Sequence, residues 1–117
     1  MNQTKTQMSP RKLGIIVLTI ATALVHLTLA FSAMRQGDMT TLIMFLLNGI
    51  GYLVFLAAYF LPLPIARDYP KLVRWAFIAF TAVTIIGWVA FGLRTTVGYI
   101  DKLIEVVLIG LLLTDRS

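Results

Sequence analysis

Few side chains in this sequence could do chemistry, and the most informative ones lie inside apolar segments. The stretch GYIDKLIEVVLIGLLL, residues 98–113, places Asp101, Lys102 and Glu105 beside a run that is apolar enough for a lipid bilayer. A charge near the bilayer centre costs about 2.5–3.5 kcal/mol on insertion scales. His26, the only histidine of the chain, lies inside another apolar segment. Carboxylates in such places either form buried hydrogen bonds or mark a proton or cation pathway.

The residue patterns of enzymes and metal sites are missing. The sequence has no Ser–His–Asp pattern, no paired-carboxylate cleft and no cluster of metal ligands, and the absence of cysteine excludes thiolate metal sites and iron–sulfur clusters. His26 alone cannot provide both axial ligands of a bis-histidine haem. The two glycines of NGIGY, residues 48–52, lie inside an apolar segment with no preceding strand, so they indicate close helix packing rather than dinucleotide binding. We expect no enzymatic activity, no cofactor and no metal.

The composition is that of an integral membrane protein with a single domain, residues 1–117. Hydrophobic residues make up 59% of the chain and charged residues 13%, whereas soluble domains are about half apolar and a quarter charged. A bilayer core needs about 20 apolar helical residues. The sequence predicts a polar basic tail over residues 1–12 and an all-α fold with transmembrane helices over 13–34, 41–61, 71–93 and 97–113.

Helix-terminating residues separate these segments. Ser9 can cap the first helix, Gly37 and Asp38 can end one helix and cap the next, and Thr95 or Thr96 can cap the last. The prolines between residues 62 and 70 predict an extended connection. Because each connection is short, we expect an up-down-up-down antiparallel bundle.

Basic residues predict the orientation of this bundle. Seven lie on one side of the expected membrane, and the other side has Arg35, Arg94 and at most Lys102; the seven are Lys5, Arg11, Lys12, Arg67, Lys71, Arg74 and Arg116. Basic residues are enriched in cytoplasmic segments. We therefore expect a bacterial plasma-membrane protein with both termini in the cytoplasm. The formal charge of +5 does not indicate nucleic-acid binding, because no basic stripe lies on a soluble element.

Polar side chains in the middle of the four segments lie at similar distances from the non-cytoplasmic ends. At 1.5 Å per residue this depth is about 10–14 Å, and the residues form a predicted buried polar layer of His26, Asn48, Tyr52, Thr84 and Glu105. We expect Glu105 to face inward and to meet His26, Asn48 or Tyr52.

Nearer the non-cytoplasmic surface, the sequence predicts a charge cluster. We expect Asp101 to pair with Arg94 or Arg35 at that surface. Lys102 lies on a different helix face, and we expect its long side chain to extend outward.

Three segments carry a resemblance to known proteins: residues 26–31 (HLTLAF), 47–62 (LNGIGYLVFLAAYFLP) and 98–113. With their motifs NGxGY and GYIDKxxE, they resemble an uncharacterised family of small four-helix membrane proteins found in bacteria and archaea. The resemblance spans most of residues 26–113 and implies a compact four-helix fold but no activity. Small multidrug transporters are similar only in length and helix count, because their essential glutamate lies in the first helix, where this chain has His26.

We expect a non-catalytic subunit or packing partner of a larger membrane complex, with a respiratory or photosynthetic electron-transfer complex as the leading candidate. The small-residue stripes and apolar faces of the helices suit contacts with other integral membrane subunits and with membrane lipids. The alternatives are a small oligomeric proton-coupled transporter and a bundle that binds a quinone or a lipid.

Overall fold

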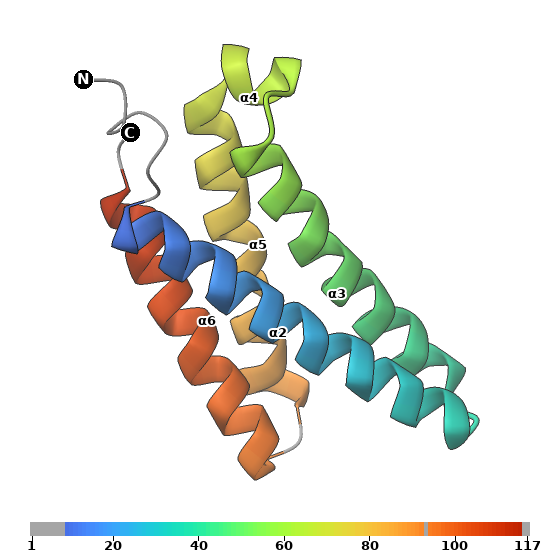
Figure 1. Ribbon diagram of the computed structural model, residues 1–117. Coiled ribbons are helices and arrows are strands. Elements are labelled where there is room, and N and C mark those ends of the chain that lie inside the picture. Colours follow the sequence, from blue (N-terminus) through green and yellow to red (C-terminus); the bar gives the residue numbers. More distant parts are fainter. Residues whose placement is uncertain (1–8, 93, 116–117) are drawn as a thin grey trace.

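The computed structural model describes residues 9–92 and 94–115, and these residues are helical or lie in short connections (Figure 1). The helices are α2 (Pro10–Arg35), α3 (Met39–Phe60), α4 (Pro64–Asp68), α5 (Pro70–Phe91) and α6 (Thr96–Thr114), and the described residues contain no strand. The predicted all-α class is therefore confirmed. Three of the helices, α2, α3 and α5, are long and apolar enough to cross a membrane.

The helix starts follow the predicted capping residues. Ser9, Asp38 and Thr95 each accept a hydrogen bond from the backbone N–H three residues later, at 3.0–3.1 Å. These bonds satisfy N–H groups that have no partner within the helix. Gly37 adopts a φ of +74° directly after α2, which a residue without Cβ does at little cost. The predicted caps are confirmed.

Three features of the predicted boundaries need a correction, and the remaining helix ends differ from the predicted ones by one or two residues. The tail of residues 1–12 is too long, because α2 begins at Pro10; residues 1–8 lie outside the described part of the chain. The extended connection contains a helix, α4, because Pro64 stands at a first helical position, where the missing N–H is not needed. The third long helix ends at Phe91 rather than at residue 93, which also lies outside the described part.

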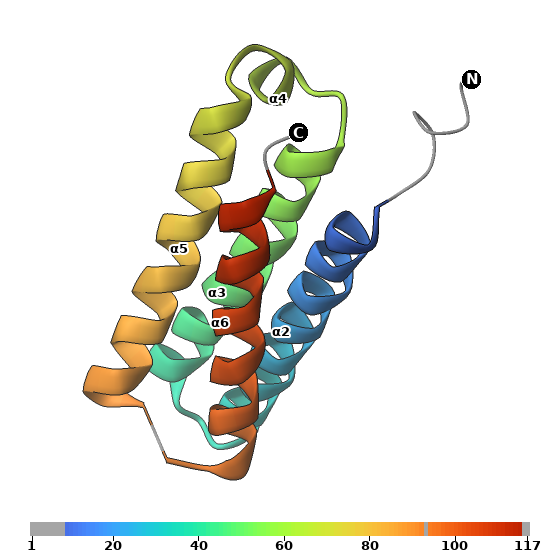
Figure 2. The same ribbon diagram turned by 90° about the vertical axis from the view of Figure 1, so that its left-hand side faces the viewer.

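The four long helices contact one another in pairs. Helix α2 packs against α3 and α6, and α5 packs against the same two helices. Among the described residues, α3 and α6 make no close backbone contact, so they lie diagonally opposite each other. Figures 1 and 2 show the chain reversing direction at each connection between long helices, while α4 lies at the end where α3 and α5 are joined.

Buried side chains gather between these helices, and large apolar side chains cover the outside. The core cluster comprises Ile15, Ala23, Tyr52, Phe77, Ile78, Leu108 and Leu112. Exposed apolar residues occur on every long helix, for example Leu24, Leu47, Ile86 and Leu103. This distribution suits a lipid environment.

Candidate functional site

The spacing of polar residues on two neighbouring helices brings them into one buried place. Thr22 and His26 lie one turn apart on α2, and Asp101 and Glu105 lie one turn apart on α6. Residues four apart share a helix face, and these two faces meet because α2 packs against α6. All four side chains are buried.

Glu105 is hydrogen-bonded from two helices. The Tyr52 hydroxyl of α3 donates to Glu105 Oε2 over 2.7 Å. The Thr22 hydroxyl lies 2.6 Å from Asp101 Oδ1 and 3.1 Å from Glu105 Oε2, so it joins the two carboxyl groups. The prediction that Glu105 faces inward and meets Tyr52 is confirmed, and its side chain has no exposed surface.

The ring of His26 is oriented by its own helix. Its Nδ1 lies 2.8 Å from the Thr22 carbonyl oxygen, and since a carbonyl only accepts, Nδ1 carries a hydrogen. Its Nε2 lies 3.7 Å from Asp101 Oδ2 and 4.0 Å from Glu105 Oε2. Nε2 therefore faces both carboxyl groups, with a lone pair when the ring is neutral and with a second N–H when it is protonated.

The prediction that Lys102 extends outward is wrong. The side chain is buried, with Nζ 2.5 Å from Glu105 Oε1 and 3.3 Å from Asp101 Oδ2. The flexible stem bends along α6 to the carboxylate three residues on, where an ammonium compensates two buried acids. Among the described residues, Glu105 Oε1 accepts no hydrogen bond of normal geometry. The ion pair with Lys102 therefore offsets the burial of this oxygen.

The net charge of this group depends on the protonation of its members. We call His26, Asp101, Lys102 and Glu105 the ionisable cluster; it holds two carboxyl groups and one ammonium close together in the core. With both acids ionised and the imidazole neutral, the net charge is −1. A buried net charge is costly, so one added proton or one small cation neutralises the cluster.

A metal ion fits this arrangement less well than a proton does. One nitrogen of His26 and one oxygen each of Asp101 and Glu105 lie within 4.8 Å of one another, and imidazole and carboxylate are common metal ligands. The Lys102 ammonium, however, already contacts both acids. A metal held by these residues would have to displace it.

The predicted polar layer divides into two groups. His26, Tyr52 and Glu105 come together as described above, whereas Asn48 and Thr84 pair with each other. Asn48 Nδ2 donates to Thr84 Oγ1 over 3.0 Å, and the Thr84 hydroxyl donates to the Phe80 carbonyl within α5. Both residues are half-buried on the α3–α5 side. Asn48 is therefore not a partner of Glu105.

The prediction of an outer charge cluster is wrong, because Asp101 and Lys102 do not pair with Arg35 or Arg94. Asp101 contacts Thr22 and Lys102 rather than an arginine. Arg94 donates instead to the carbonyls of Trp88 and Val89, at 3.2 and 2.7 Å, and lies 4.3 Å from the Trp88 ring centroid. Both carbonyls belong to the last turn of α5, where some carbonyls lack helical partners; that of Trp88 also accepts the backbone N–H of Gly92. Arg35 lies over the Phe31 ring, 5.9 Å from its centroid.

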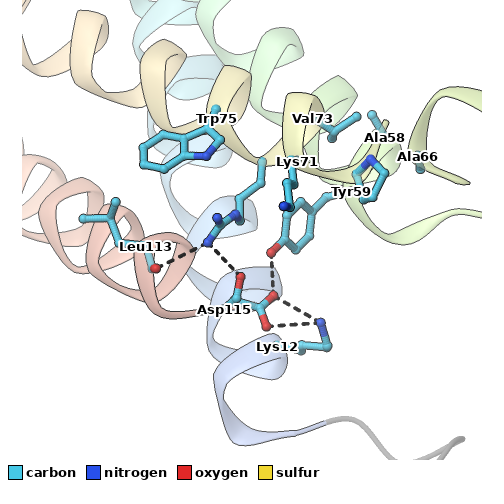
Figure 3. A pocket seen from close by; sticks show the side chains of 11 residues that line it. Lys12, Ala58, Tyr59, Ala66, Lys71, Val73, Trp75, Leu113 and Asp115 are labelled. Carbon is cyan, nitrogen blue, oxygen red and sulfur yellow. Dashed lines mark hydrogen bonds and ion pairs between the residues drawn. The ribbon is translucent and has the colours of Figure 1, made fainter. Parts of the chain in front are cut away.

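A second polar group, the Asp115 cluster, was not predicted. Asp115 is buried directly after α6; Lys12 Nζ lies 3.1 Å from its Oδ2, and the Tyr59 hydroxyl donates to the same oxygen (Figure 3). Arg74 Nη1 donates to three carbonyls at the end of α6, including that of Asp115. The available signal was that four expected spans bring the two ends of the chain, with Lys12 and Asp115, to the same side of the bundle.

Two glycines let α3 approach its neighbours near Tyr52. A Cβ at Gly49 would lie 2.8 Å from Leu27 side-chain carbons and 3.2 Å from the Ala23 carbonyl oxygen of α2. A Cβ at Gly51 would lie 2.5 Å from the Phe80 ring of α5. The NGIGY segment is thus a close-packing site, as predicted, and it fixes the distance from which Tyr52 reaches the cluster.

A search among known proteins found no matching family model, no matching curated protein and no matching solved structure. The resemblance to the uncharacterised four-helix family therefore stays a prediction. Function has to be argued from the chemistry of the site itself.

Proposed function

We propose that α6 crosses the membrane together with α2, α3 and α5, as an antiparallel four-helix bundle. The three charged side chains of α6 would oppose insertion into a membrane if they faced lipid, but they point inward and pair with one another. Its outward side carries Leu103, Val106 and Val107, all exposed. The helix therefore presents lipid with an apolar face despite its charges.

The proposed orientation places both chain ends in the cytoplasm. Most basic residues of the described part lie at the end of the bundle where α4 lies. At the opposite end, the exposed basic residues of the described part are Arg35 and Arg94. Because the chain has no cysteine, single cysteines can test this. Gln36→Cys should react with an impermeant thiol reagent in intact cells, and Asp68→Cys should react only after the cells are opened. The reverse pattern would overturn the orientation.

For the function itself, we propose a small proton-coupled transporter that works as an oligomer. The observation that carries this proposal is the ionisable cluster itself, two carboxyl groups, an imidazole and an ammonium buried within a few ångströms of one another inside helices that suit a membrane. Ionisable groups in such places belong to proton and cation pathways by default.

The cluster offers a route for the proton between its members. His26 Nε2 faces Asp101 and Glu105, so a proton can move among the three groups through small side-chain movements. Protonation of either acid weakens its attraction for the Lys102 ammonium. A cationic substrate would compete with the proton for the same carboxylates, which is the basis of coupled exchange.

Reconstitution into proteoliposomes tests this function. With tetraphenylphosphonium inside the vesicle as a cationic probe, a pH gradient should drive exchange of protons for the probe through the wild-type protein, and an internal pH-sensitive dye reads the proton flux. Glu105→Gln keeps the side-chain shape and should abolish the flux while the protein still assembles. The matched control Asp68→Asn removes an exposed carboxylate outside the cluster and should keep it. Equal flux in wild type and Glu105→Gln would contradict the proposal.

A second candidate is the non-catalytic subunit of a larger membrane complex, for example an electron-transfer complex. The observation that favours it is the open surface of α3, in which only Gly49 and Tyr52 are buried among 22 residues. Purification from native membranes in a mild detergent separates the two candidates. Co-migration with larger redox subunits supports the second, and a small homo-oligomer supports the transporter.

A further inference from the structure

Two cavities adjoin at the end of the molecule where α3 and α5 are joined. The first, of about 550 Å³, is lined by polar and apolar side chains from α2, α3, α4, α5 and the end of α6 (Figure 3). The second, of about 630 Å³, is lined by apolar side chains of α3, α4, α5 and the α3–α4 connection. Ala58 and Val73 line both cavities, so the two share a wall.

The first cavity has a surplus of positive charge. Lys12, Lys71 and Arg74 line it, and Asp115 is the acid that faces them. Arg74 uses Nη1 for the carbonyls at the end of α6, and among the described residues its Nε and Nη2 have no hydrogen-bond partner. Lys71 is exposed and makes no ion pair within the same described part. These donors are available to an anion.

The start of α5 adds a second, independent feature. Pro70 and Lys71 line the cavity as the first residues of this 22-residue helix, and no side chain caps its N-terminus. The N-terminal N–H groups of a long helix attract anions such as phosphate. Trp75, which also lines the cavity, is a residue type enriched at the level of lipid headgroups.

We propose that the two cavities together bind one anionic phospholipid. The basic cavity takes the headgroup phosphate, held by Lys71, Arg74 and the start of α5. The apolar cavity takes the first part of an acyl chain, between α3 and α5. The adjoining apolar cavity favours a lipid over free phosphate, because free phosphate has no acyl chain to fill it. This site lies apart from the ionisable cluster and does not depend on the proposed transport.

Native mass spectrometry of the full chain tests the headgroup site. Offered equal amounts of phosphatidylglycerol and phosphatidylcholine in mild detergent, the wild type should retain phosphatidylglycerol. Lys71→Gln should lower this retention about fivefold, the effect of one basic residue near a headgroup. Arg67→Gln is the matched control, because Arg67 is exposed at the same end, loses the same charge and does not line the cavity. Equal retention of both lipids, or equal losses in the two variants, would overturn the proposal.

Two further comparisons test the acyl-chain part. Ala76→Phe fills the apolar cavity and should lower retention, whereas Ala79→Phe places the same ring on the exposed side of α5 and should not. Wild-type protein should also prefer long-chain over dihexanoyl phosphatidylglycerol, a comparison that does not depend on how Ala76→Phe folds. Equal binding of the two chain lengths, or displacement of the lipid by millimolar inorganic phosphate, would overturn the lipid assignment.

Discussion

The Tyr52 hydroxyl hydrogen-bonds to Glu105 across the diagonal of the helix group. It donates over 2.7 Å from α3 to α6, two helices whose backbones make no close contact among the described residues. The Tyr52 ring packs edge-on against Phe80 of α5, with centroids 4.9 Å apart. One side chain therefore links three helices and ends on the acid of the ionisable cluster.

Tyr52→Phe should destabilise the protein while leaving its packing intact. The substitution keeps the ring against Phe80 but removes the donor to Glu105. The free energy of unfolding in detergent should fall by about 1 kcal/mol, since membrane hydrogen bonds contribute about 0.6 kcal/mol on average and an unsatisfied buried acceptor costs somewhat more. Tyr99→Phe, at an exposed tyrosine, should change nothing measurable. Equal effects of the two would mean that the buried bond does not matter.

Glu105→Gln and Glu105→Ala should differ in stability. Glutamine keeps the side-chain shape and an acceptor for Tyr52, so the free energy of unfolding should be nearly unchanged. Alanine leaves the Tyr52 hydroxyl without its acceptor and the Lys102 ammonium with Asp101 alone, which should cost about 1–3 kcal/mol. Chemical unfolding followed by helical circular dichroism measures both. A loss in Glu105→Gln as large as that in Glu105→Ala would show that the carboxylate charge itself is required for folding.

Lys102→Met should be the most damaging change in the cluster. It leaves two buried acids without their ammonium, and breaking a buried ion pair from one side costs about 3–5 kcal/mol. The double variant Lys102→Met with Glu105→Gln should recover much of this loss, because one acid is also gone. A double-mutant cycle measures the coupling. Arg35→Met, at an exposed cation, serves as the control, and strictly additive effects in the cycle would contradict the ion pair.

Gly49→Ala should loosen the contact between α2 and α3. The added Cβ meets Leu27 carbons at 2.8 Å and the Ala23 carbonyl at 3.2 Å, and overpacking costs about 1–3 kcal/mol. Gly110→Ala is the matched control, because a Cβ there meets nothing within 4 Å. There the higher helix propensity of alanine should leave stability unchanged or slightly raised. Equal losses at both glycines would contradict the close approach.

The start of α3 should contribute an acid-sensitive part of the stability. The hydroxyl and backbone N–H of Thr41 donate to the Asp38 carboxylate and lower its pKa below the ordinary 3.8. Because the pKa is lower in the folded state, this stabilisation is complete above the unfolded pKa and is lost as the pH falls through the folded one. Asp38→Asn keeps the capping oxygen but cannot titrate. Unfolding curves recorded down to pH 2 should converge for the two proteins in acid; parallel curves would contradict the role of Asp38.

Sequence periodicity predicted the parts of the fold that depend on one helix at a time. The buried stripe of α2, with Thr22 and His26, and the inward placement of Glu105 follow from spacings of three and four residues. The caps follow from residue types at the helix ends. Tyr52 was among the partners expected for Glu105.

Contacts that depend on the rotation of two helices, or on a flexible side chain, could not be predicted in this way. Helical spacing places Lys102 on a different face from Asp101, but its stem bends back to both acids. Whether Asn48 meets Glu105 or Thr84 depends on the rotation of α3 about its axis. A local sequence pattern does not determine this rotation. The Asp115 cluster joins residues from both ends of the chain, so no segment by itself indicated it.

The inward charges of α6 have a consequence for biogenesis. On the proposed topology, α6 leaves the ribosome after α2, α3 and α5 and is the most costly of the four to insert by itself, because a charge near the bilayer centre opposes insertion by about 2.5–3.5 kcal/mol. Thr22, His26 and Tyr52, which receive those charges, lie on helices synthesised earlier. On that topology the earlier helices would act as an intramolecular chaperone for α6, and a nascent chain truncated before α6 would leave the polar side chains of α2 and α3 without their partners.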